Sequence, residues 1–204
     1  LPEALTLRNQ MLQQFEIAAK DPSAIDRGAI TFTIAGAGPT GVEMAGAIVE
    51  LLEALRGDFP HLPLDRARVI VVEMVDAVLP PYSQRMQRYS RESLEERGIE
   101  VCLGTAIERV EADRVVLADG SDIPSHTLIW TAGVRANPLA DLLGADQTKG
   151  GQVVVDDDLR LPGASNVFII GDMAGVTDES GDPLPQLAPV AIQQGKHVAA
   201  QVTR

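Results

Sequence analysis

A glycine motif between an apolar strand and an apolar helix constrains the fold of this chain more than any other feature. The apolar run Ile30 to Ala35 leads directly into Gly36-Ala-Gly38-Pro-Thr-Gly41. From Thr40 to about Leu55 the residues are small and apolar, with helical character. A strand, a G-x-G-x-x-G turn and a helix in this order predict a dinucleotide-binding site, and the alternative is an ordinary glycine turn.

The three glycines of the motif have separate physical roles in such a site. Gly36 permits the tight turn, Gly38 lets the backbone approach a pyrophosphate, and Gly41 lets the helix and the strand pack closely. The first N–H groups of the helix and the positive end of its dipole then face the phosphates. We therefore expect a Rossmann-like α/β domain.

Composition and charge exclude several classes of protein. The net charge of −12 argues against binding to nucleic acid and against adsorption to an anionic membrane surface. No apolar stretch reaches the ~18 residues of a membrane-spanning helix, and no signal peptide is visible. The single cysteine, Cys102, excludes an internal disulfide and suits a reducing cytoplasm. We expect Cys102 to be a buried, inert thiol.

Helical and strand-like patterns alternate along the rest of the chain. Apolar residues at helical spacing predict helices over residues 3–20, 84–97 and 189 onward. Strands are predicted over residues 68–73, 99–103, 106–111, 114–117, 127–131, 153–155 and 166–171. The strands between residues 99 and 131 indicate one parallel strand, a small antiparallel meander and a return strand.

An acidic residue ends the first strand after the glycine motif. Glu73 closes the run that begins at Arg68, where a dinucleotide fold binds the adenosine ribose. The gap from the motif exceeds the usual ~20 residues because a proline-containing loop, residues 57–66, intervenes. A carboxylate here repels a 2′-phosphate, which predicts a preference for NAD over NADP. The alternative is that Glu73 only caps an exposed strand end.

Three stretches together resemble the type II NADH dehydrogenases, the single-chain NADH:quinone oxidoreductases. They are GAGPTGVEMAG (36–46), LIWTAGVRANP (128–138) and NVFIIGDMAG (166–175). In that family an NADH domain is inserted into an FAD domain. The resemblance implies that residues 27–133 form the NAD(H)-binding domain and that residues 1–26 and 134–204 are parts of an incomplete FAD-binding domain. The family's first glycine motif and its C-terminal membrane-contacting segment would lie outside this sequence.

The resemblance also assigns roles in binding NADH. It implies that the pyrophosphate is held by Gly36, Gly38, Pro39, Thr40 and Gly41, and that Glu73 binds the adenosine ribose. Glu43 would lie near the nicotinamide, and its alternative is a solvated helix glutamate. The segment Thr131-Ala132-Gly133 would close over the nicotinamide side.

On the flavin side, the resemblance implies that Gly171 and Asp172 contact the phosphate and the ribityl chain of FAD. The alternative for Asp172 is a turn aspartate after a strand. The helix that begins near Ala188 would direct its N-terminus at the isoalloxazine. In the family, quinone-site residues follow an A-Q-x-A-x-Q pattern, but here proline replaces the first glutamine. Gln193 and Gln194 remain candidates for the quinone site, or they are polar residues of an ordinary helix.

The resulting interpretation is part of a flavin-dependent NADH dehydrogenase. Hydride would pass from NADH to FAD, and electrons would then pass to a quinone. The parent protein would contact the cytoplasmic face of a membrane peripherally, and a homodimer is compatible with this interpretation. Alternatives are an NAD(H)-binding module without turnover, a ferredoxin reductase, an NAD(P)H oxidase and a non-enzymatic scaffold that does not bind NADH. A disulfide reductase is disfavoured because the chain lacks a cysteine pair, and no metal site is predicted from its scattered histidines.

Overall fold

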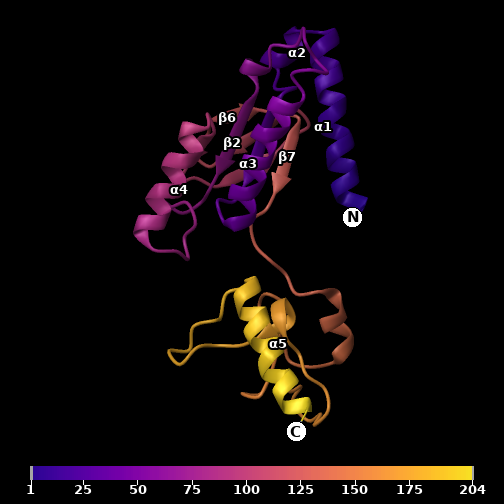
Figure 1. Cartoon of the computed structure of the whole chain (residues 1–204), viewed down its shortest axis with the longest axis vertical. Coiled ribbons are helices and arrows are strands. Elements are labelled where there is room, and N and C mark those ends of the chain that lie inside the picture. The colour runs from indigo at the N-terminus through magenta and orange to yellow at the C-terminus, as the bar shows by residue number, and fades with distance from the viewer. Residues whose placement is uncertain (1, 204) are drawn as a thin grey trace. The chain divides into compact units, whose positions relative to one another are not determined.

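The computed structural model describes residues 2–203, which form two compact units (Figure 1). The first unit extends to Ala132 and the second begins at Gly133. The resemblance assigns residues 1–26 to the FAD-binding domain, and the described part of this segment, residues 2–26, falls within the first unit of this chain.

The first unit is built on a four-stranded parallel sheet with the order β3-β2-β1-β7. Strand β1 lies between β2 and β7, so that Thr33 is opposite Ile70 on one side and Leu128 on the other. The four strands lie within the predicted runs, at Thr31–Ala35 (β1), Arg68–Val72 (β2), Glu100–Cys102 (β3) and Thr127–Trp130 (β7).

Both faces of this sheet are buried, which explains why its strands are nearly continuous apolar runs. Val69 and Val71 of β2 belong to the core on the helical face, whereas Ile70 and Val72 belong to the core under the antiparallel meander. The helical core also contains Phe15, whose ring lies 5.6 Å from that of Phe32 between centroids. The helices of this unit are α1 (Pro2–Lys20), α2 (Ser23–Asp26), α3 (Pro39–Ala54) and α4 (Gln84–Glu96).

The predicted meander is present and has three antiparallel strands in the order β4-β5-β6. Val115 and Leu117 of β5 pack against the parallel sheet, together with Ile123 of β6. The strands are Ile107–Val110 (β4), Arg114–Leu117 (β5) and Asp122–Pro124 (β6). The sequence prediction missed β6 because three residues that end in proline carry too short a pattern.

The second unit contains short strands, irregular segments and one long helix. Strands β8 (Val153–Val154) and β9 (Ala174–Gly175) pair in parallel, and α5 spans Ala188–Val202. Short 3₁₀ helices occupy Pro138–Leu143 and Gly171–Met173. The buried core cluster of this unit consists of Ala140, Val153, Ile169 and Ala174.

The predicted strand over residues 166–171 is wrong. The segment forms only an isolated antiparallel bridge between Phe168 and Arg160. Its backbone bonds run from Leu161 N–H to the Val167 carbonyl and from Ile169 N–H to the Leu159 carbonyl, at 2.9 Å each. The apolar run therefore has strand-forming residues but, within the described chain, no neighbouring strand that would extend the ladder.

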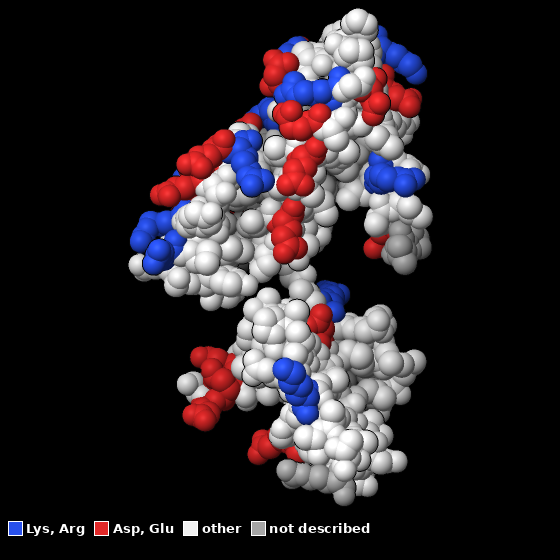
Figure 2. All heavy atoms as spheres, in the orientation of Figure 1, with Lys and Arg blue, Asp and Glu red and all other residues white. Residues whose placement is uncertain are grey.

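The surface shown in Figure 2 carries acidic and basic side chains interspersed over the first unit. No helix of the described residues is long and apolar enough to cross a membrane. The same residues contain no group of three or more His, Cys, Asp or Glu side chains placed to hold a metal ion.

Cys102 is expected to react slowly with alkylating reagents in the folded protein. Its thiol is only partly buried, but this burial raises its pKa, and the nearby Glu100 carboxylate raises it further. Because the thiolate is the nucleophile, iodoacetamide should modify folded protein at pH 8 several-fold more slowly than urea-unfolded protein. Glu100→Gln removes the negative charge and should accelerate the reaction, and equal rates for folded and unfolded wild type would contradict the expectation.

Candidate functional site

The carboxyl edge of the parallel sheet holds a pocket of about 260 Å³. Its wall includes Ala35, Val72 and Trp130, which end β1, β2 and β7. The pocket lies where the connections from β1 and its neighbours diverge, which is the usual ligand site of an open α/β sheet. The other lining residues are Gly36, Glu73, Met74, Thr105, Ala106, Ile107 and Ala132.

The glycine turn at this edge needs two of its glycines for reasons internal to the chain. Gly36 has a φ of +104°, and its N–H donates to the Val72 carbonyl at 2.8 Å. A Cβ at Gly41 would lie 1.9 Å from the Gly36 carbonyl oxygen. Any side chain at Gly41 would therefore separate the start of α3 from the turn.

Gly38 differs from the other two because nothing in the protein requires it to be glycine. Its φ of −71° is open to any residue, and a Cβ there would meet no described atom within 4 Å. Gly38 is the N-cap of α3, Pro39 follows in the first turn, and no side chain of the described residues caps this helix end. Exposed Thr40 completes the motif. The result is open space in front of a helix N-terminus, where an anion is stabilised.

Glu73 is held in place by backbone donors. One carboxylate oxygen accepts from Ala37 N–H at 2.8 Å, and the other accepts from Val75 N–H at 3.1 Å. The side chain is only partly buried and lines the 260 Å³ pocket. Glu73 thus ties the glycine turn to the end of β2 and presents negative charge at the pocket wall.

The segment after β7 closes the other side of the turn. Thr131 donates to the Ala35 carbonyl through its N–H at 2.9 Å and through its hydroxyl at 2.8 Å. Ala132 lies so close to the turn that a Cβ at Gly36 would meet its backbone at 3.1 Å. Gly133, with a φ of +76°, begins the second unit.

Trp130 is a pocket residue that the sequence reasoning did not single out. Its indole Nε1–H donates to the Ala132 carbonyl at 2.9 Å, and 62% of the residue is exposed. The available signal was its position at the end of a predicted strand, immediately before Thr131.

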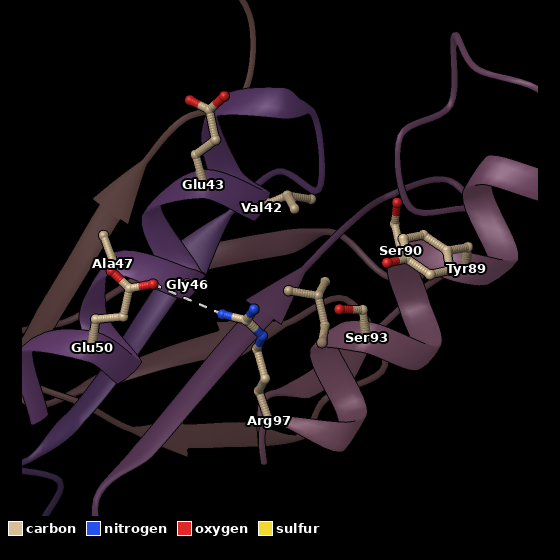
Figure 3. Close-up of a pocket in the computed structure, with 10 residues that line it drawn as sticks. Val42, Glu43, Gly46, Ala47, Glu50, Tyr89, Ser90, Ser93 and Arg97 are labelled. Carbon is tan, nitrogen blue, oxygen red and sulfur yellow. Dashed lines mark ion pairs between the residues drawn. The ribbon is translucent and has the colours of Figure 1, made fainter. Parts of the chain in front are cut away.

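Glu43 does not line the 260 Å³ pocket. It lies exposed on α3, beside a separate groove of about 400 Å³ between α3 and α4 (Figure 3). Tyr89 of α4 and Arg97, which follows the end of α4, line the same groove, and Arg97 pairs with Glu50 at 3.9 Å. In Figure 3 the Glu43 carboxylate points away from this ion pair.

The second unit brings together three of the residues assigned to the flavin side. Gly171, Asp172 and Gln194 line one small pocket at the start of α5. The side-chain amide oxygen Oε1 of Gln194 accepts from Gly171 N–H at 2.6 Å, and only 7% of Gln194 is exposed. Ala188 is the first residue of α5, and Gln193 is exposed. Gln194 therefore supports the backbone at Gly171, whereas Gln193 makes its own side chain available to solvent.

Sequence comparisons connect this geometry to known proteins. A family model described as pyridine nucleotide-disulphide oxidoreductase matches residues 6–195. Two type II NADH:quinone oxidoreductases of Mycobacterium tuberculosis are 37% and 34% identical to this chain, over 99% of its length. These alignments cover 45% and 44% of the two relatives. The chain thus spans less than half the length of these curated relatives.

Solved structures with the same architecture agree. NDH2 from Plasmodium falciparum, solved in complex with NADH, has a TM-score of 0.74 at 19% identity, over 85% of this chain and 38% of that one. A ferredoxin reductase from Rhodopseudomonas palustris has a TM-score of 0.66 at 23% identity, over 85% and 41%. These likenesses confirm the predicted α/β fold with a parallel and a small antiparallel sheet. The family model that matches residues 6–195 establishes that the chain belongs to the pyridine nucleotide-disulphide oxidoreductase family.

Proposed function

We propose that this chain is the NADH-binding part, with a portion of the flavin-binding part, of an FAD-dependent NADH:quinone oxidoreductase. The observation that carries the proposal is the open space at Gly38, in front of the uncapped N-terminus of α3. No side chain of the described chain fills this space, so a ligand can approach the backbone closely. The helix N-terminus suits a phosphate.

The residues around this space suit the two halves of NADH. Gly36, Gly38 and Gly41, with Pro39 and Thr40, would hold the pyrophosphate. The Glu73 carboxylate, already fixed by Ala37 N–H and Val75 N–H, would accept hydrogen bonds from the adenosine ribose. Thr131, Ala132 and Gly133 would border the nicotinamide half, and Glu43 would approach the nicotinamide from α3.

The second unit has polar groups that suit part of an FAD. The exposed Asp172 carboxylate can accept hydrogen bonds from ribityl hydroxyls, and Gly171 has a φ of +66° with no backbone within 4 Å of a Cβ. The first residue of α5, Ala188, follows a cap without a side-chain hydrogen bond, so the positive helix end is free for an electron-rich ring. Bound FAD supplies the ability to take up a hydride and pass on electrons.

A quinone acceptor, and a peripheral position on the cytoplasmic face of a membrane, complete the proposal. The quinone acceptor is supported by the two Mycobacterium tuberculosis relatives, which are NADH:quinone oxidoreductases. Exposed Gln193 is the residue of α5 that we assign to the quinone side, because Gln194 is already bonded to Gly171. A homodimer belongs to the same proposal.

An NAD(H)-binding module without turnover is the second candidate for the chain by itself. The favouring observation is that the first unit covers both faces of its sheet, whereas the second unit has a core cluster of only four buried residues among those described. An absorption spectrum recorded with added FAD, before and after NADH, separates the two candidates. Flavin bands that bleach favour the oxidoreductase, and a colourless protein that still binds NADH favours the module.

NADH binding itself can be measured through the single tryptophan. Trp130 lines the 260 Å³ pocket, so bound NADH should quench its emission by energy transfer to the reduced nicotinamide. We expect a saturable loss of emission during an NADH titration. A titration that shows only linear inner-filter loss, together with no heat of binding in calorimetry, would reject NADH binding by this chain.

Gly38→Ala and Gly41→Ala should fail in different ways. A methyl group at Gly38 meets open space, so the free energy of unfolding should fall by no more than about 1 kcal/mol, the usual cost of alanine at a helix N-cap. NADH affinity should nevertheless fall by roughly tenfold or more, because the methyl group occupies the phosphate approach. At Gly41 the methyl group meets the Gly36 carbonyl, which should cost roughly 3 kcal/mol of folding free energy.

Urea unfolding and NADH titration of the two variants give the comparison. If Gly38→Ala binds NADH as tightly as wild type, no phosphate approaches this turn and the proposed function is wrong.

Glu73 variants should change the preference between NADH and NADPH. Wild type should prefer NADH, because the carboxylate accepts from ribose hydroxyls and repels a 2′-phosphate. Glu73→Gln removes the charge but keeps one acceptor for Ala37 N–H. Glu73→Ala removes both the charge and that acceptor. Both variants should reduce the ratio of NADH to NADPH affinity by roughly tenfold, the effect of losing one charge-assisted hydrogen bond.

Glu73→Ala should lose more NADH affinity than Glu73→Gln, because its glycine turn also loses an anchor. Affinities for both dinucleotides are measured by calorimetry at one ionic strength. An unchanged ratio in both variants would mean that Glu73 only caps the strand end.

A further inference from the structure

One buried hydroxyl beside the 260 Å³ pocket has no hydrogen-bond partner among the described residues. Among the residues that the structure describes, four buried side-chain polar atoms lack a partner, and Thr105 Oγ1 is one of them. Thr105 lines the 260 Å³ pocket and also an adjoining open hollow of about 710 Å³. An unpaired buried hydroxyl disfavours the folded state, and a valine would fill the same volume without that cost.

The backbone fixes Thr105 relative to Glu73. Thr105 N–H donates to the Glu73 carbonyl at 3.2 Å, and Gly104 N–H donates to the Val75 carbonyl at 3.2 Å. The loop after β3 is thereby tied to the loop after β2. Any ligand group that reaches past the Glu73 carboxylate meets this loop.

The strand order decides which half of a dinucleotide reaches Thr105. In the order β3-β2-β1-β7, the glycine turn follows β1, Glu73 follows β2, and Thr105 lies beyond β3. A dinucleotide with its pyrophosphate at the turn and its ribose at Glu73 directs its purine toward the β3 side. Trp130, at the end of β7, lies on the opposite side of the turn.

We propose that the Thr105 hydroxyl binds the adenosine half of the dinucleotide through a hydrogen bond to the edge of the purine. This inference rests on the proposed NADH-binding function. A hydroxyl both donates and accepts, so it can pair with either kind of atom on a purine edge. One step of χ1 moves Oγ1 to another staggered position, from which the hydroxyl can reach a ligand in the pocket that Thr105 lines.

The test compares Thr105→Val with wild type in two measurements. Calorimetry with NADH and with ADP-ribose, which lacks the nicotinamide, should show that both affinities fall by about three- to tenfold, as expected for one lost neutral hydrogen bond. Without ligand, the melting temperature should rise by roughly 2–6 °C, because the unpaired hydroxyl is gone. If Thr105 had a purely structural role, its replacement by valine would not weaken binding and raise the melting temperature at the same time.

Two further variants serve as controls. Thr33→Val removes another unpartnered hydroxyl, in a fully buried residue of β1, and should raise the melting temperature without changing either affinity. Thr105→Ser keeps the hydroxyl and should retain wild-type affinity for both ligands.

Three results would overturn the inference. They are unchanged affinity in Thr105→Val, a loss for NADH without a loss for ADP-ribose, and an equal loss in Thr105→Ser. Wild type that binds neither ligand would instead reject the proposed function, and this inference would fall with it.

Discussion

The close approach of α3 to the glycine turn is the contact on which the rest of the first unit depends. Because Gly41 has no Cβ, the first turn of α3 lies directly against the Gly36 carbonyl. The same turn bonds to the end of β2 through Gly36 N–H, and Thr131 bonds to the end of β1 beside it. Three strand ends are thereby held together at one edge, and the 260 Å³ pocket is the space that they enclose.

The glycines of the motif separate the needs of the fold from the needs of a ligand. Gly36 and Gly41 would be required even in a protein that binds nothing, because their surroundings are the chain's own backbone. Gly38 has an ordinary φ and open space around it at the start of α3, so the fold itself does not require glycine there and the proposed phosphate would use the space. Glu73 combines both needs, because its carboxylate anchors Ala37 N–H and also faces the pocket.

The parts of the site that could be predicted from sequence depend on local patterns. A strand, a glycine turn and a helix are contiguous, and Glu73 directly follows a short apolar run, so their places follow from the order of residues. Trp130 and Thr105 were missed because their significance comes from tertiary neighbours. The Thr105 hydroxyl is informative only because the folded chain leaves it unpaired, which no spacing reveals.

In the second unit, sequence pattern alone also fails to predict what tertiary neighbours decide. Residues 166–171 have the apolar pattern of a strand, but a strand also needs a neighbour, and the segment forms a single bridge at Phe168. Gln194 has the pattern of a polar helix residue, yet it is buried against Gly171. The local pattern gives the propensity of a segment to form a helix or a strand, whereas its tertiary neighbours decide which structure it adopts. The first unit covers both faces of its own sheet. For that reason NADH binding is the proposed property that can be tested with this chain by itself.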